Sequence, residues 1–420
     1  MRHLIVNIGQ LLTMAGGDRP RRGKEMGAVH PILDGAVLVE DGKIAAAGFK
    51  DLVLNDGRAR GSRIIDAGGR VVLPGFVDSH SHPVFAAPRL DDFESRIRGK
   101  TYEEIAARGG GILSTVDKVR GATQSALTAG LQARAARFIE AGTTTLEAKS
   151  GYGLDLDTEL KMLRAIETVG SGGPLELVGT LLAAHAVPPE FEGKKDEYVR
   201  AVCSEIIPRV AGEGLAKFVD VFCENGYFSV EDARQVLAAG AKAGLRGKVH
   251  AEQLSLSGGT QAAVGLNAVS ADHLERCAEP DILALAASGT VATLLPGSDY
   301  FLSKPYPDAR KFIDLGAAVA LATDFNPGSC PCWDMRMILS IACTQMRMTP
   351  VETLVAATIN GAHALGLGAT HGSLQAGKAA DLVCWEAVDY REIPYFFGAS
   401  GAAWVMKAGN IVHSKEDIRL

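Results

Sequence analysis

The chain has 420 residues, a formal net charge of −6, 47% hydrophobic and 22% charged residues, which is an ordinary balance for one large and one smaller globular domain. It has no apolar run of about 18 residues, no charged-then-apolar leader and no basic stretch, which argues against a membrane or nucleic-acid partner. Its seven scattered cysteines imply no disulfide framework, so we expect a cytoplasmic protein.

Both ends of the chain are rich in short apolar segments separated by turns. Residues 40–43 (EDGK) and 407–410 (KAGN) have the composition of hairpin turns between such segments. The matched patterns predict that residues 1–70 and 366–420 together form one small β-sandwich domain. Two unrelated appendages are the alternative.

The middle of the chain, residues 71–365, alternates apolar strands with helical patterns. Strands are predicted at 71–79, 143–148, 176–185, 217–223, 247–250, 268–272, 290–295 and 318–323. Helices are predicted at 122–141, 229–243, 307–315 and 350–365, and the second of these opens with a capping box formed by Ser229 and Asp232. Eight such units favour an α/β fold of the (β/α)8 TIM barrel type, because a doubly wound sheet usually carries a GxGxxG turn that is missing here.

Polar side chains gather where the predicted barrel strands end, which is where such barrels carry their chemistry. Five of the ten histidines lie there, and so does an aspartate: His80, His82, His185, His250, His273 and Asp324. Three imidazoles and a carboxylate, from His80, His82, His250 and Asp324, suit one zinc or iron ion with an open position for water. A second ion would need a further bridging group such as a modified Lys149. Because Lys149 is expected in a loop beside residues 151–153, we expect a single ion.

The remaining strand-end groups suit acid–base chemistry. Asp324 can accept a proton from the water, and His273 can act as an acid, a base or an electrophile. A second-sphere hydrogen bond is the simpler alternative for His273.

Several longer stretches carry a resemblance to a known family. They are PGFVDSHSH (74–82), EAKSGYGL (147–154), VDVFCENGYFS (219–229), KVHAEQLS (248–255), SADHLE (270–275) and LATDFNPGS (321–329). With the split β-rich ends they resemble the amidohydrolase superfamily, and within it the chain is similar to the imidazolonepropionase family. The resemblance covers most of the barrel. It departs from the family in PVFAAPR after His82 and in LLPGSDYFL (294–302).

The resemblance implies hydrolysis of 4-imidazolone-5-propanoate to N-formimidoyl-L-glutamate, the third step of histidine degradation. It assigns metal binding to His80, His82, His250 and Asp324, and catalysis to His273, Asp324 and Gln253. It assigns substrate binding to Arg89, Tyr102, Tyr152, His185, Gln253, Asn326, Gly328 and Ser329. Arg89 suits the substrate carboxylate, whereas Gln253 replaces an acid of some members and can only hydrogen-bond.

Other functions stay open at this point. Another amidohydrolase acting on a cyclic amide, or a purine or pyrimidine aminohydrolase, would share the metal ligands but would give Arg89 no role. A non-catalytic metal- or ligand-binding barrel is the alternative from another class. We expect a small-molecule substrate and a homodimer, with no nucleic acid or membrane partner.

Overall fold

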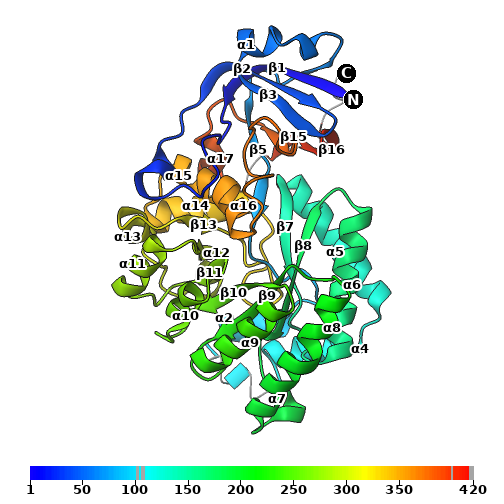
Figure 1. Ribbon diagram of the computed structural model, residues 1–420, viewed down its shortest axis with the longest axis vertical. Helices are drawn as coiled ribbons and strands as arrows, with labels where there is room; N and C mark the ends of the chain where they lie inside the picture. The colour runs from blue at the N-terminus through cyan, green and yellow to red at the C-terminus, as the bar shows by residue number, and fades with distance from the viewer. Residues whose placement is uncertain (101–103, 106–108, 399–400, 416–420) are drawn as a thin grey trace.

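The computed structural model describes residues 1–100, 104–105, 109–398 and 401–415 and contains the expected parallel barrel (Figure 1). Its eight strands follow one another in chain order around one sheet. They are β6 (Phe76–Asp78), β7 (Thr143–Lys149), β8 (Glu176–Ala184), β9 (Phe218–Cys223), β10 (Arg246–Ala251), β11 (Ser270–His273), β12 (Val291–Leu294) and β13 (Val319–Leu321). Each predicted barrel strand therefore overlaps an observed one.

Backbone contacts between the first and last strands close the barrel. Ser81 and Phe325 form a parallel bridge just beyond β6 and β13. The His82 amide donates to the Phe325 carbonyl at 2.8 Å, and the Asp324 amide donates to the His80 carbonyl at 3.0 Å. The closing seam therefore runs through the segments that carry three of the predicted metal ligands.

Helices surround the barrel, and all of them except the one at Leu90–Ile97, which has no buried residue, help to bury its outer apolar face. They are α2 (Leu90–Ile97), α4 (Ile112–Gly121), α5 (Gln124–Glu140), α6 (Leu156–Gly172), α7 (Lys195–Ala201), α8 (Ile207–Gly212), α9 (Val230–Lys242), α10 (Gly259–Gly265), α11 (Glu279–Ala287), α12 (Pro296–Leu302), α13 (Ala309–Asp314), α14 (Met335–Met346), α15 (Pro350–Val355) and α16 (Gly361–Ala364). The helix predicted at 229–243 is α9, whose Ser229 and Asp232 form the expected capping box. The single helix predicted at 350–365 is α15 and α16 with a π-helical segment between them. Within the described residues, none of the helices is long and apolar enough to cross a bilayer.

Strands from both ends of the chain come together, as predicted, and form one mixed sheet. Its strands are β1 (Arg2–Leu11), β2 (Ile32–Glu40), β3 (Lys43–Phe49), β4 (Arg63–Asp66), β5 (Val71–Pro74), β14 (Leu382–Trp385), β15 (Ala402–Lys407) and β16 (Asn410–Ser414), with α1 (Lys50–Leu54) and α17 (Glu392–Tyr395) beside it. Ile5 and Val37 share a buried cluster with Leu382 and Met406. The two ends therefore enclose a common core.

The strand predicted at 71–79 is two strands in the structure. Residues 71–74 pair with β1 and β14 of the mixed sheet, and residues 76–78 begin the barrel. Gly75 lies at the crossing, where a Cβ atom would come within 2.3 Å of the Thr144 side chain. A continuous apolar run did not reveal this break, because both sheets bury their residues at this point.

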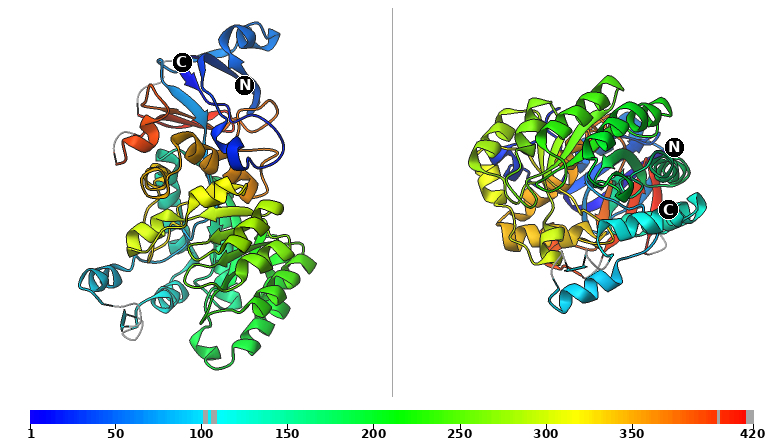
Figure 2. Two further views of the ribbon diagram at one scale, coloured as in Figure 1. Left: turned by 90° about the vertical axis from the view of Figure 1, so that its left-hand side faces the viewer. Right: turned by 90° about the horizontal axis from the view of Figure 1, so that it is seen from below.

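The mixed sheet lies at the end of the barrel where β6 begins. The carboxyl ends of the barrel strands, where the predicted site residues stand, lie at the opposite end. Figure 2 shows the two β-rich ends together at one pole of the molecule, with α2 and α4 at the other.

Candidate active site

Four side chains converge at the carboxyl end of the barrel. His80 and His82 follow β6, His250 lies in β10, and Asp324 follows β13. The Nε2 atoms of His82 and His250 lie 3.4 Å apart. Asp324 Oδ1 lies 3.6 Å from His82 Nε2 and 3.8 Å from His80 Nε2. The predicted ligand set is thus brought together.

The chemistry of these side chains fits a divalent cation. His80 Nε2 is buried and has no hydrogen-bond partner among the described residues, as expected for a nitrogen that faces a metal. Burial lowers the pKa of His80 and of His82 well below the ordinary value, and that of His250 to about 4. Neutral imidazole is the form that coordinates a metal, so these residues would hold a divalent metal ion together with the Asp324 carboxylate.

A buried layer of charged residues supports two of these histidines. Asp272 Oδ2 lies 2.7 Å from His80 Nδ1, and Asp220 Oδ2 lies 2.9 Å from His250 Nδ1. The hydrogen bond to Asp272 makes Nδ1 of His80 the protonated nitrogen and leaves its Nε2 for the metal, whereas His250 Nδ1 has a carboxylate beside it.

Lys149 lies in the same layer, at the end of β7 rather than in the loop where the sequence suggested it. Its Nζ lies 2.7 Å from Asp220 and 2.9 Å from Glu147, and Lys248 is 2.9 Å from the same Glu147 oxygen. Because Lys149 is committed to two carboxylates, the structure favours a single-ion site.

The sequence did carry a signal for this layer. Glu147 and Lys149, and likewise Lys248 and His250, stand two residues apart in apolar strands, so each pair points to the same side of the sheet. Reasoning from the last polar residue of each strand alone misses this layer.

His273 differs from the three ligand histidines. Burial acts to lower its pKa, but the charge of Glu275 and its hydrogen bond outweigh burial and raise the pKa to about 9. Glu275 Oε1 lies 3.0 Å from His273 Nδ1. This pairing with Glu275 sets His273 apart from the predicted metal ligands.

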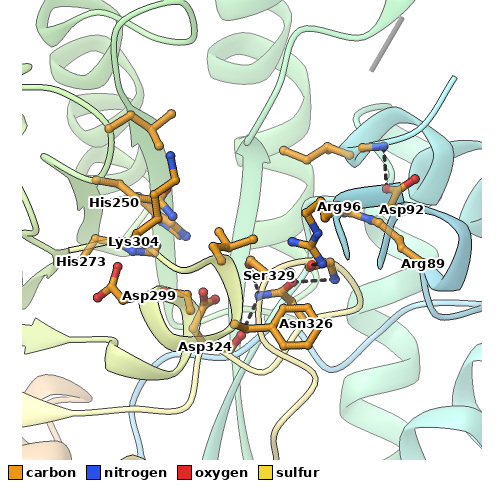
Figure 3. A pocket seen from close by; sticks show the side chains of 18 of the residues that line it. Arg89, Asp92, Arg96, His250, His273, Asp299, Lys304, Asp324, Asn326 and Ser329 are labelled. Atoms are coloured by element: carbon orange, nitrogen blue, oxygen red, sulfur yellow. Dashed lines mark hydrogen bonds between the residues drawn. The ribbon is translucent and has the colours of Figure 1, made fainter. Parts of the chain in front are cut away.

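A cavity of about 720 Å³ opens onto the metal ligands, and seven residues predicted to bind substrate line it. They are Arg89, Tyr152, His185, Gln253, Asn326, Gly328 and Ser329. Figure 3 shows His250 and His273 on one side of this cavity and Arg89 and Arg96 on the other, with Asp324 and Asn326 between them. Tyr102 lies outside the described residues.

Arg89 is held at the cavity wall by two neighbours. Its Nε donates to Thr115 Oγ1 at 2.7 Å. A Cβ atom at Gly328 would stand 2.2 Å from Arg89 Nη1, so the absence of a side chain there makes room for the guanidinium. Arg96, which the sequence did not single out, donates from Nη2 to the Gly328 carbonyl at 3.0 Å.

The SGYGL loop after β7 presents Tyr152 and orients His185. Buried Glu159 accepts hydrogen bonds from the amides of Gly151, Gly153 and Leu154, at 2.8–3.2 Å. His185 Nδ1 lies 2.9 Å from the Gly151 carbonyl, so Nδ1 carries the proton and Nε2 is left as an acceptor. The His185 ring stacks on that of His82, with centroids 5.3 Å apart.

Asn326 shapes the loop that follows β13. Its amide donates to the Asp324 carbonyl and to Ser329 Oγ, both at 2.7 Å, and accepts from the amides of Gly328 and Ser329. The Asn326 side chain is therefore engaged within the loop, whereas Gln253 reaches the cavity from the segment after β10.

A barrel with this metal-ligand set at its carboxyl end defines a class of metal-dependent hydrolases, and comparison with known proteins identifies the family. The model of the amidohydrolase family matches residues 71–412. The chain belongs to this family, and within it to the imidazolonepropionases.

Two relatives illustrate the similarity. The imidazolonepropionase of Symbiobacterium thermophilum is 46% identical over 419 residues, which cover 99% of this chain and 98% of the relative. That of Bacillus velezensis is 43% identical over 421 residues, covering 99% and 98%.

Solved structures share the fold at low sequence identity. An adenosine deaminase from Xanthomonas campestris with bound zinc aligns with a TM-score of 0.71 and 18% identity, covering 99% of this chain and 94% of that one. The guanine deaminase of E. coli aligns with a TM-score of 0.72 and 15% identity, covering 99% and 100%. At this identity the likeness concerns the fold alone.

Proposed function

We propose that the protein hydrolyses the ring carbon–nitrogen bond of 4-imidazolone-5-propanoate, giving N-formimidoyl-L-glutamate in the third step of histidine degradation. The observation that carries this proposal is one cavity whose wall holds three of the four predicted metal ligands, His82, His250 and Asp324, with Arg89 across from His250. The names of relatives that are 42–46% identical over nearly the whole chain support the same substrate.

Recognition of the substrate divides between its two ends. The Arg89 guanidinium binds the propionate carboxylate, because its fork of N–H donors matches that group. Tyr152 and the acceptor nitrogen of His185 contact the ring. Gln253 has a neutral amide and contributes a hydrogen bond rather than a proton.

The reaction needs an activated water and a stabilised carbonyl oxygen. The divalent ion, one zinc or iron held by the four ligands, polarises a carbonyl group and lowers the pKa of a water molecule when bound. Asp324 accepts a proton from the attacking water. His273 donates a hydrogen bond to the carbonyl oxygen as negative charge develops there, and the ring nitrogen takes up a proton as its bond to carbon breaks.

The test is a turnover assay with purified, metal-loaded protein that follows the loss of imidazolone absorbance and identifies the product by mass spectrometry. Arg89→Gln should raise KM by about 10- to 100-fold, since a hydrogen bond to a charged group contributes about 1.5–3 kcal/mol. Arg98→Gln, at the exposed end of α2, is the matched control. Folded wild-type protein without turnover, or with release of ammonia, would refute the proposal.

Two further expectations belong to this proposal. Metal analysis of the purified protein decides between zinc and iron, which imidazole and carboxylate ligands both accept. Sedimentation analysis tests the expected homodimer, and the cytoplasmic location stays a prediction.

A further inference from the structure

A pair of carboxyl groups lies behind His273, outside the roles assigned above. Glu275 follows β11 and binds His273 Nδ1 through Oε1. Asp299 comes from α12, and its carboxyl group is a hydrogen-bonding neighbour of Glu275. Asp299 is 3% exposed and the Glu275 side chain 4%, and both line the cavity. Figure 3 shows Asp299 beside His273.

The second oxygens of this pair lack partners. Glu275 Oε2 and Asp299 Oδ2 are buried and have no hydrogen-bond partner among the described residues. Two buried carboxylates in contact would repel each other and leave acceptors unsatisfied, whereas a proton shared between them removes both costs. Burial, together with the charge of Glu275, raises the pKa of Asp299 to about 9, which agrees with a neutral Asp299.

The backbone that aims Glu275 at His273 is strained. His273 and Leu274 have φ values of +85° and +71°, in the region that residues other than glycine rarely adopt. Such a conformation is unfavourable for these residues and persists only where its surroundings hold it. Here the Leu274 and Arg276 amides donate to the carbonyls of Ala251 and Glu252, which fixes the turn against the end of β10.

We propose that Asp299 is a positioning residue: its protonated carboxyl group donates to Glu275, and Glu275 in turn holds the Nδ1–H of His273 so that Nε2 faces the substrate. The part that concerns substrate rests on the proposed function. Without this donor, Glu275 would be a buried anion with only one partner and would be free to turn away from the imidazole.

Two substitutions of Asp299 separate this role from simple packing. Asp299→Asn keeps the shape and supplies a permanent N–H donor to Glu275, whereas Asp299→Ala supplies none. Removing the outer partner of a functional histidine typically costs about 10- to 100-fold. We expect a loss of kcat of that size, with KM changed less than about threefold, in D299A but not in D299N. Equal losses in D299N and D299A would overturn the proposal.

The ring nitrogens provide a readout that needs no substrate. In metal-loaded protein labelled with ¹⁵N-histidine, the His273 signals, assigned with His273→Asn, should match wild type in D299N and shift in D299A. Unchanged His273 signals in D299A would overturn the proposal, even if the turnover assay had refuted the proposed substrate. The pair Asp314→Asn and Asp314→Ala, at an exposed aspartate, is the matched control.

A double-mutant cycle keeps the proposal testable if D299A folds poorly. Asp299→Leu then replaces it as a variant of similar volume. In a Glu275→Gln background no buried anion needs a donor, so the Asn and Leu variants of Asp299 should differ in kcat by less than about threefold. The proposal would be overturned if these two variants differed in kcat as much in the Glu275→Gln background as they do in the protein with Glu275 unchanged.

Discussion

At the scale of single residues, the Arg89 guanidinium occupies the space that a side chain at position 328 would fill, so its position depends on Gly328. We expect Gly328→Ala to push the Arg89 guanidinium away, because the new Cβ would stand 2.2 Å from Nη1. The side-chain end can move, so the fold should survive while KM rises about tenfold or more through a weakened hydrogen bond to the carboxylate. Steady-state kinetics and thermal melting measure the two effects.

Gly265→Ala is the control for Gly328→Ala, because a Cβ atom at Gly265 meets nothing within 4 Å. A Gly328→Ala protein with unchanged KM would contradict the role given to Arg89. Equal KM values for the double variant Gly328→Ala/Arg89→Gln and for Arg89→Gln alone would confirm that the two residues act together.

Sequence reasoning selected residues whose signal is local. His80, His82, His250 and Asp324 stand at strand ends, where the fold itself gives a polar residue a place next to the others. Asp299 and Glu159 carry no such signal. Their roles arise from contacts with Glu275 and with loop amides, which only the folded chain brings together.

At the scale of the elements, the barrel strands share a buried charge layer centred on Lys149. We expect Lys149→Met to lower the free energy of unfolding by about 3–5 kcal/mol, because Asp220 and Glu147 would lose a buried counter-charge. Denaturant unfolding measures the loss, and Lys242→Met on the exposed side of α9 serves as the control. A loss below about 1 kcal/mol would show that the layer is neutralised without Lys149.

The SGYGL loop depends on one carboxylate of α6. Glu159→Gln replaces an acceptor oxygen by an amide group that cannot accept from the Gly151, Gly153 and Leu154 amides as the carboxylate does. We expect a loss of about 1–3 kcal/mol of stability and a higher KM, since Tyr152 and His185 are set by this loop. Thermal melting and kinetics test this, with exposed Glu167→Gln of the same helix as the control. A normal KM with lowered stability would limit Glu159 to the fold.

The prediction of helices and strands succeeded where the spacing of apolar residues was clearly helical. It failed where one apolar run passes through two different sheets. Helix α9 was recognised from its cap and spacing, and its observed bounds lie within one residue of the prediction. Residues 71–79 are apolar throughout because two different sheets bury them, so their pattern could not mark the change at Gly75. The sequence predicts that residues 1–70 and 366–420 form one domain and that residues 71–365 form the other. This division into two folding units stays a prediction.

At the scale of the whole molecule, an ion cluster joins the barrel to the mixed sheet. Glu176 of β8 contacts Lys407 of β15 at 2.8 Å and His371 at 2.8 Å. Burial acts to raise the pKa of Glu176, but the hydrogen bond from His371 and the charge of Lys407 lower it to about 2. A lowered folded-state pKa stabilises the fold above the unfolded value, and this stabilisation is lost as pH falls from about 5 towards 2.

We therefore expect Glu176→Gln to flatten the acid side of the stability curve. The wild type should lose up to about 2 kcal/mol more than the variant between about pH 6 and pH 3. Urea unfolding at a series of pH values measures this difference. If stability fell with pH in the same way in the two proteins, the ion cluster would not stabilise the contact between the barrel and the mixed sheet. Glu167→Gln is the control for the loss of an exposed glutamate.

The closing seam of the barrel has a consequence for how the protein is made. The ligands His82 and Asp324 lie next to each other only because the first and last strands meet, although 242 positions of the chain separate them. During synthesis the nascent chain can acquire the complete ligand set only after residue 324 has emerged, so most of the barrel exists before the metal can be captured. We therefore expect the complete predicted ligand set to form only after the pairing of the first and last strands, which has a high contact order and forms late.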